Sequence, residues 1–282
     1  MSETHTPTGR VKNGTSGTTG TPSTKTVLRL EKIEKSFHQR TADAYRALRG
    51  VNLEVPEGDF ITIVGGNGAG KSTLLNVIAG SILVDSGRVV IDETEVTRLP
   101  EEERAGLIGR IFQDPKLGTA PRMTVAENLL LASKRGEGRG FKISMNEAKR
   151  EEFRRVLAPL KLGLEDRLDT EIGVLSGGQR QSVALIMATL KTPRLLLLDE
   201  HTAALDPKTA RKVLDYTAKV IADNGLTALT ITHHLKDALN FGNRMLVMNH
   251  GEIVHDFNAS QKASMTDAEL YTLVGELEDQ DI

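Results

Sequence analysis

The chain has 282 residues, which is enough for one large domain or two modest ones. Hydrophobic residues make up 39% and charged residues 26%, a balance typical of a globular protein that buries a sizeable core. The formal net charge of −2 argues against a general electrostatic attraction to nucleic acid or to anionic lipid. The sequence contains no cysteine, which excludes disulfides and thiol catalysis.

Residues 1–26 are rich in Thr, Gly and Ser and hold few large apolar side chains. Such a segment buries too little apolar surface to offset its ordering entropy, so we expect a disordered tail. The N-terminus shows no apolar signal-peptide core. No stretch approaches the roughly 18–20 apolar residues that span a bilayer. We therefore expect a soluble chain that reaches a membrane only through a partner.

Strands and one helix are predicted in the first third of the folded part. VLRLEKI from Val27 and VNLEV from Val51 alternate as half-buried strands. FITIV at residues 60–64 is a continuous apolar run that enters a Gly-rich loop, as buried parallel strands do. Residues 71–80 have helical spacing and end on a glycine. RVVID predicts a further strand.

The pattern changes between about residues 115 and 175, where MTVAENLLLAS and NEAKREEFRRVLAPL read as amphipathic helices. We expect an inserted helical subdomain there. Apolar runs at 195–199 and 226–232 then predict buried strands on either side of a helix at about 207–223. This alternation predicts right-handed crossovers and a mainly parallel sheet. A hairpin should turn at His250–Gly251, and residues 259–282 should form a helical and acidic tail.

The string GGNGAGKST matches G-x-x-x-x-G-K-[ST] and lies between an expected strand and an expected helix, as the motif requires. Its glycines let backbone N–H groups converge on phosphate oxygens, and the helix adds its positive end. Lys71 would reach the β- and γ-phosphates, and Ser72 would ligate Mg²⁺. The sequence thus predicts ATP and Mg²⁺ as ligands, held by Gly65, Gly66, Asn67, Gly68, Ala69, Gly70, Lys71, Ser72 and Thr73.

Acidic and polar side chains follow the other expected strands. Asp199 ends the apolar run LLLLD, where it would hold Mg²⁺, and Glu200 would orient or deprotonate an attacking water. By themselves, the two acids could also cap a helix. Gln113 could bind Mg²⁺ or water and follow movement of the helical insertion. His233 could donate a hydrogen bond to a γ-phosphate, whereas the side chain of His234 should point elsewhere.

The string LSGGQRQ at residues 175–181 predicts a second anion site. Ser176 is a good N-cap, and the two glycines after it expose backbone donors at the start of a helix. The first phosphate loop is already complete, so a second phosphate clamp is useful only if it faces the nucleotide of another subunit.

These strings, together with AALD and THH, occur in an order that resembles the ATP-binding-cassette (ABC) ATPases, over about residues 27–256. The resemblance implies an α/β P-loop NTPase with a RecA-like, mainly parallel sheet, an antiparallel β subdomain and the inserted helical subdomain. The ATPase domain would then occupy residues 27–258. Phe37 would stack on adenine, with Tyr45 as the rival aromatic residue, and Gln113 would lie near a docked membrane subunit.

The resemblance further implies a homodimer with two shared ATP sites. Ser176, Gly177, Gly178 and Gln179 would bind the ATP of the opposite subunit, Asp206 would be the aspartate of the D-loop, and His233 the switch histidine. One departure is His201, where most of the family has proline. This variant, with IFQDPKLGTAPRMTVAENL and KDALNFGNR, resembles the ATPases of bacterial tryptophan or tyrosine uptake systems.

The expected role is therefore the ATP-hydrolysing subunit of a bacterial importer of amino acids or similar solutes, at the cytoplasmic face of the membrane. Its partners would be a second copy, two integral-membrane permease subunits and, indirectly, a solute-binding lipoprotein; nucleic acid is not expected. An exporter or lipid-extraction ATPase is the alternative. A non-transport ABC ATPase is a weaker one, because no sustained heptads separate the phosphate loop from LSGGQ.

Overall fold

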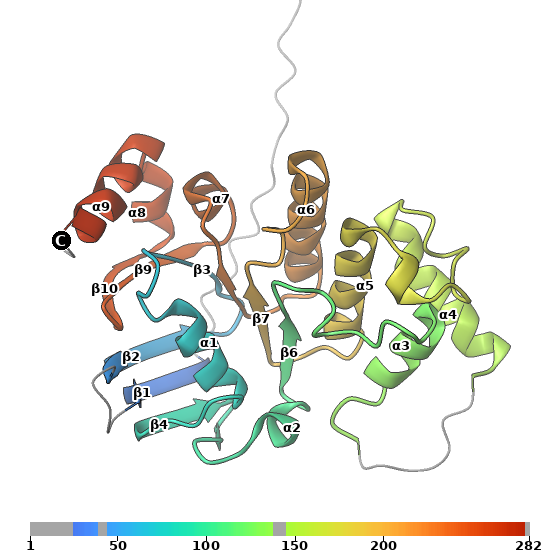
Figure 1. Ribbon diagram of the computed structural model, residues 1–282, viewed down its shortest axis with the longest axis horizontal. Helices are drawn as coiled ribbons and strands as arrows, with labels where there is room; N and C mark the ends of the chain where they lie inside the picture. The colour runs from blue at the N-terminus through green and yellow to red at the C-terminus, as the bar shows by residue number, and fades with distance from the viewer. Residues whose placement is uncertain (1–24, 39–43, 138–144, 280–282) are drawn as a thin grey trace, which may run out of the picture.

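The computed structural model describes residues 25–38, 44–137 and 145–279 (Figure 1). The tail expected at residues 1–26 therefore lies outside the described residues, except for Lys25 and Thr26, and Thr26 already begins the first strand. Within the described ranges, no helix combines the length and the apolar character that crossing a bilayer requires.

One sheet is antiparallel and has four strands. It is drawn in blue to blue-green at the lower left of Figure 1. Leu28, Leu30 and Ile33 of the first strand point into the core, as the alternating sequence predicts. The strand order is β2 (Tyr45–Pro56), β1 (Thr26–Phe37), β4 (Ser86–Ile91) and β5 (Thr94–Glu95).

The second sheet has six strands, of which five are parallel, as expected. Its central strands are buried over nearly their whole length, which explains their continuous apolar sequences. The expected hairpin is present, with left-handed backbone at His250 and Gly251. The strand order is β10 (Glu252–Phe257), β9 (Arg244–Asn249), β3 (Phe60–Val64), β8 (Ala228–Ile231), β7 (Leu195–Asp199) and β6 (Ile108–Ile111).

Helices on the right of Figure 1 have a hydrophobic core of their own, centred on Leu129, Phe153 and Leu157. The first of them starts at a capping box between Thr124 and Glu127, a local signal that the sequence contains. This group comprises α3 (Val125–Ala132), α4 (Glu147–Leu157), the 3₁₀ turns at Ala158–Leu160 and Ile172–Val174, and α5 (Gly177–Thr189).

The remaining helices pack around the six-stranded sheet. Two C-terminal helices join the core beside β9, where Leu270 and Val274 are buried. The elements are α1 (Lys71–Ala79), α2 (Glu101–Arg104), α6 (Pro207–Asp223), α7 (Leu235–Asn240), α8 (Ala259–Ser264) and α9 (Asp267–Asp279).

The strand register brings the chemistry-bearing segments to one edge of this sheet. Ile63 pairs with Ile231, Ile231 with Asp199, and Leu198 with Ile111. The carboxyl ends of β3, β8, β7 and β6 are therefore level with one another. In open α/β sheets, ligands bind at this edge.

Candidate nucleotide-binding and catalytic site

The phosphate loop runs from β3 into α1 in a conformation that requires glycine. Gly65, Gly68 and Gly70 all have positive φ, at 146°, 82° and 95°. A Cβ on Gly65 would lie 2.1 Å from the Met248 carbonyl oxygen, and a Cβ on Gly70 would lie 2.5 Å from that of Ala47. Side chains are thus excluded at Gly65 and Gly70, where a glycine backbone can approach a phosphate closely.

Lys71 begins α1 and is only 5% exposed. Its Nζ donates hydrogen bonds to the carbonyl oxygens of Gly65 and Gly66, at 2.8 and 2.7 Å. These bonds hold the ammonium group against the loop, where an anion would experience its charge directly. Ser72 and Thr73 occupy the first turn of α1, with Ser72 exposed.

A cavity of about 180 Å³ opens in front of this loop. It joins the sequence-predicted loop residues to two side chains from other strand ends, Glu200 after β7 and His233 after β8. The lining is completed by Tyr45 and Ala47 of β2, and comprises Tyr45, Ala47, Asn67, Gly68, Ala69, Gly70, Lys71, Ser72, Thr73, Glu200 and His233.

Glu200 and His233 contact one another directly, with Oε1 and Nε2 2.5 Å apart. The Glu200 side chain is only 11% exposed, whereas that of His233 is 44% exposed. A shielded carboxylate beside a phosphate cradle is suited to orient a water and to accept its proton. The sequence placed both residues in the site, and the fold brings them together.

Asp199 lies at the end of β7, and burial raises the pKa of its carboxyl, with the charge of Glu200 adding to this effect. Arg110, His233 and Lys71 act in the opposite direction. A cation would relieve the cost of this buried negative charge. The Ser72 hydroxyl and the Asp199 carboxylate are oxygen donors of the kind that Mg²⁺ prefers.

The described residues contain no cluster of three His, Cys, Asp or Glu side chains suited to a metal. Mg²⁺ sites of nucleotide-binding proteins commonly use only one or two protein ligands, with substrate phosphates and water supplying the others. The residues present therefore fit Mg²⁺ bound together with a nucleotide.

The two candidate adenine-stacking residues lie together at the mouth of the cavity. Their rings are stacked, with centroids 5.5 Å apart and planes inclined by 26°. Tyr45 lines the cavity and is 53% exposed, whereas Phe37 is half-buried behind it and is not part of the lining. The sequence ranked Phe37 first; the structure places Tyr45 nearer to the phosphate loop.

Gln113 follows β6 by two residues and is exposed. Among the described residues that line the phosphate cavity, Gln113 does not appear. It lies instead where the chain leaves the sheet for the helical part. Its neighbour Phe112 lines a different cavity.

The LSGGQ segment forms the start of α5. Ser176 and Gln179 make a reciprocal capping box, in which Ser176 Oγ accepts from the Gln179 N–H and Gln179 Oε1 accepts from the Ser176 N–H. A Cβ on Gly178 would lie 2.2 Å from Thr209 Cγ2, so a larger residue there would force the Thr209 side chain to move. Within the described part of the chain, none of these residues lines the phosphate cavity. Figure 1 shows α1 and α5 on either side of β6 and β7.

Asp206 is exposed and caps α6, since its Oδ1 accepts a hydrogen bond from the Thr209 N–H at 3.1 Å. These contacts with Thr209 lower the pKa of the Asp206 carboxyl. Asp206 also lies outside the lining of the phosphate cavity. The sequence-predicted residues thus form one assembled group around the loop and a second group elsewhere on the same chain.

Arg110 of β6 was missed by the sequence analysis. Its guanidinium donates to Asn76 Oδ1 on α1 at 2.5 Å and packs over the Phe112 ring at 4.4 Å. Its positive charge also acts to lower the pKa of the Asp199 carboxyl. The signal was a lone arginine between Ile108 and Ile111 in a short buried strand.

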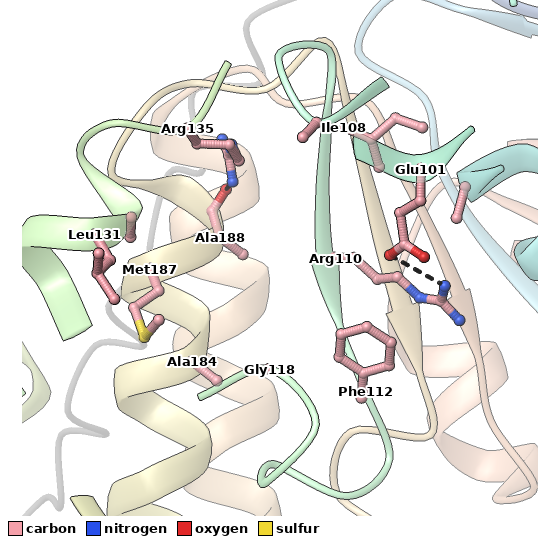
Figure 2. Close-up of a pocket in the computed structure, with 13 residues that line it drawn as sticks. Glu101, Ile108, Arg110, Phe112, Gly118, Leu131, Arg135, Ala184, Met187 and Ala188 are labelled. Atoms are coloured by element: carbon pink, nitrogen blue, oxygen red, sulfur yellow. Dashed lines mark hydrogen bonds and ion pairs between the residues drawn. The ribbon is translucent and has the colours of Figure 1, made fainter. Parts of the chain in front are cut away.

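A second cavity, of about 340 Å³, lies between the sheet and the helical part (Figure 2). Ile108, Arg110 and Phe112 line it from the β6 side, where Arg110 is drawn paired with Glu101. The opposite wall comes from α3, α5 and the turn after α3, with Leu131, Arg135, Ala184, Met187 and Ala188.

The match to a family model decides the classification: the model described as "ABC transporter" covers residues 48–203, more than half of the chain. The chain belongs to the ABC transporter family. The resemblance seen in the sequence motifs is thereby confirmed, and so is the expectation that the protein is an ATPase.

This ABC ATPase is similar to characterised members of the family. It is 41% identical, over 86% of its own length and 97% of the relative, to the tyrosine transport ATP-binding protein of Clostridioides difficile. It is 37% identical, over 83% and 85%, to the phosphonates import ATP-binding protein PhnC 1 of Rhodopseudomonas palustris.

Solved structures confirm the fold of this ABC ATPase. The ADP conformation of the ATP-binding cassette MJ1267 superimposes with a TM-score of 0.74 at 32% identity, over 90% of this chain and 99% of that one. A dimeric post-hydrolysis state of the cassette MJ0796, bound to ADP and Pi, gives 0.69 at 31% identity, over 82% and 98%. The P-loop NTPase fold class expected from the sequence is therefore confirmed.

Proposed function

We propose that this ABC ATPase powers a bacterial importer of amino acids or similar small solutes, at the cytoplasmic face of the cell membrane. The observation that carries its catalytic part is the Glu200–His233 contact inside the cavity of the phosphate loop. The substrate class is supported by the relative named for tyrosine transport.

ATP is the substrate, with its phosphates on the N–H groups of residues 65–73 and its adenine against Phe37 or Tyr45. Mg²⁺ would be held by Ser72 and Asp199, with Gln113 as a further candidate ligand, and would supply charge neutralisation at the phosphates. Lys71 contacts the β- and γ-phosphates. Glu200 orients the attacking water and accepts its proton, while His233 donates a hydrogen bond to the γ-phosphate.

A second copy of the chain completes each site. Ser176, Gly177, Gly178, Gln179 and Asp206 lie outside the phosphate cavity of their own chain. The start of α5, where Ser176 and Gly177 are exposed, is a position that favours an anion, and it lies outside the phosphate cavity of the described chain. The relative MJ0796 is dimeric. We therefore assign these residues to the nucleotide of the opposite protomer.

The cavity between sheet and helical part is the proposed docking place for a permease segment, one on each protomer of the dimer (Figure 2). It is walled mainly by apolar groups and is flanked by Arg110, Arg135 and Glu101. Gln113 follows Phe112 of this cavity by one residue. Movement of a docked segment could thus be transmitted to the catalytic edge. A solute-binding lipoprotein would deliver cargo to the permeases.

The domain boundaries expected from the sequence belong to the same proposal. The ATPase domain spans residues 27–258, with the helical insertion at about 115–175, and residues 259–282 form a C-terminal tail. In the described part of that tail, α8 and α9 pack against the β9 side of the core.

Glu200→Gln tests the catalytic assignment. It should reduce ATP turnover to a small residual rate without weakening ATP binding, because it removes the proton acceptor and leaves the phosphate loop intact. The variant should form a stable ATP-dependent dimer in gel filtration. His234→Gln, on the adjacent loop but outside the cavity lining, is the matched control and should hydrolyse ATP at the native rate. Native turnover by Glu200→Gln would remove Glu200 from this role.

The transported substrate needs a separate experiment. The solute-binding protein that co-purifies with the assembled transporter should be screened by thermal shift against tyrosine, tryptophan, polar amino acids and phosphonates. A rise in Tm with aromatic amino acids supports the proposed class, because a ligand that binds the folded form stabilises it. A rise with phosphonates alone would contradict it, while leaving the catalytic assignment untouched.

A further inference from the structure

His201, which follows Glu200, is buried in the space between the sheet and α6. Only 4% of the residue is exposed. A polar ring in so buried a place needs a hydrogen-bond partner.

The single hydrogen-bond partner of this ring among the described side chains is Thr217 on α6, with His201 Nε2 and Thr217 Oγ1 3.2 Å apart. The Thr217 hydroxyl has one proton, which it donates to the Val213 carbonyl oxygen at 2.8 Å. It must therefore accept from His201, so that the imidazole carries its proton on Nε2.

Glu200 itself has a left-handed backbone, with φ of 43°. This conformation is unfavourable for a residue with a side chain, and it persists only where the surroundings fix it. On the N-terminal side, the Glu200 N–H donates to the Ile231 carbonyl oxygen of β8. On the C-terminal side, the next residue is His201, whose ring is fixed on α6.

The loop from β7 to α6 is consequently tied to α6 at both of its ends. His201 bonds to Thr217 in the middle of the helix, and Asp206 caps the first turn through Thr209. Figure 1 shows α6 beside β7. One helix thus sets the position of the residue after the catalytic glutamate and that of the D-loop aspartate.

We propose that His201 is a positioning residue that holds Glu200 in its left-handed turn through the hydrogen bond to Thr217. The proposal rests on the catalytic role assigned to Glu200 above. The side chain of His201 thereby anchors the turn after β7 to α6. Loss of the anchor frees the Glu200 carboxylate to leave the place where it meets water, while the phosphate loop keeps its shape.

His201→Leu removes the hydrogen bond to Thr217 and fills the space with an apolar side chain of similar bulk. His201→Gln keeps an N–H donor. His201→Leu should lower kcat by on the order of tenfold or more, since small displacements of a catalytic group have effects of this size. Its ATP dissociation constant should stay native. His201→Gln should recover much of kcat. Thr217→Val should reproduce the loss, and Thr217→Ser should restore the rate.

Val213→Ala, a cavity-forming change at a buried position of α6, is the control for lost stability. It should lower Tm and leave kcat of the folded enzyme native. Should His201→Leu fail to fold, Thr217→Val carries the same test from the other side of the hydrogen bond. A native kcat for both variants would overturn the proposal.

Measurements in the Glu200→Gln background distinguish the role of His201 from the role of Glu200. If His201 acts through Glu200, adding His201→Leu to Glu200→Gln should leave the residual rate unchanged. A further loss in the double variant, equal to the loss in the single one, would show that His201 acts elsewhere. Native turnover by Glu200→Gln alone would instead defeat the catalytic assignment itself.

Discussion

At the scale of single residues, the catalytic edge combines charges from four strand ends in a small volume. Burial raises the pKa of Asp199, and the nearby side chains of Arg110, His233 and Lys71 oppose that shift. The carboxylate of Glu200 lies against His233. Preorganised charge of this kind is the largest contribution to many enzymatic rate enhancements. The strand ends thus supply the charged side chains, and the loops supply the shape of the cavity.

The stacked aromatic pair leads to a prediction about nucleotide affinity. Tyr45→Ala and Phe37→Ala should each weaken ATP binding, by a factor of about 5–50, because the first removes a ring from the cavity mouth and the second removes its support. Titration of each variant with a fluorescent ATP analogue measures the change. Tyr271→Ala, an exposed aromatic residue on α9, is the control and should bind normally. Native affinity in both cavity variants would exclude this pair from adenine binding.

At the scale of elements, a buried lysine joins the C-terminal helix α8 to the end of α7. Lys262 Nζ donates to the carbonyl oxygens of Phe241 and Gly242, just past the last residue of α7. Burial lowers the pKa of Lys262 to about 8. The helix that follows His233 is therefore fixed at its far end by a segment distant in sequence.

This contact predicts a pH-dependent stability. The Lys262 pKa is about 8 in the folded protein, against the ordinary value of 10.5 that applies to the unfolded chain. Between these pH values the unfolded chain binds more protons, so the free energy of unfolding should rise as the pH rises. Lys262→Met, which cannot titrate, is the matched control. The wild-type value minus the variant value, from urea titrations at pH 7.5 and 9.5, should increase; a constant or falling difference would contradict the buried ammonium.

Elements that depend on local sequence could be predicted, whereas long-range pairing could not. The apolar runs of β3 and β7 and the limits of α6 follow from periodicity and capping within the segment itself. The order of the antiparallel strands depends on contacts between distant segments, which local patterns do not encode.

The same distinction applies to the site. The loop glycines and Glu200 were identified because each belongs to a short local motif, GGNGAGKST or LLLLDE. Outside the site, Arg104 was missed because a charged residue is usually exposed. It is buried and donates to the Val77 and Ile78 carbonyl oxygens near the end of α1. The positions of Phe37 and Tyr45 depend on the chain between them, and spacing alone could not decide which ring lies nearer the loop.

At the scale of the whole molecule, the phosphate cavity and the LSGGQ segment occupy different parts of one chain. Under the proposed assembly, one subunit holds the phosphate loop of one site and the LSGGQ segment of another. Closed twofold symmetry is the simplest way to bring the two parts together, because each copy offers what the other requires.

Complementation between two inactive variants tests this arrangement. Ser176→Arg disrupts the LSGGQ segment, and Lys71→Ala disrupts the phosphate loop, so each homodimer should be inactive. A mixed dimer contains one site built from the intact loop of one protomer and the intact LSGGQ of the other. An equimolar mixture should therefore regain up to about a quarter of native ATPase activity. A mixture no more active than its separate components would contradict sites shared between protomers.

The phosphate loop also joins the two sheets. The Ala69 carbonyl oxygen accepts from the Gly251 N–H of the β9–β10 turn, and the Gly251 carbonyl oxygen accepts from the Arg49 N–H of β2. Nucleotide bound to this loop therefore stabilises a junction, and through it the relative placement of both sheets. Amide hydrogens of β2 and of the β9–β10 turn should exchange with solvent in one cooperative opening, which ATP slows to the same degree in both.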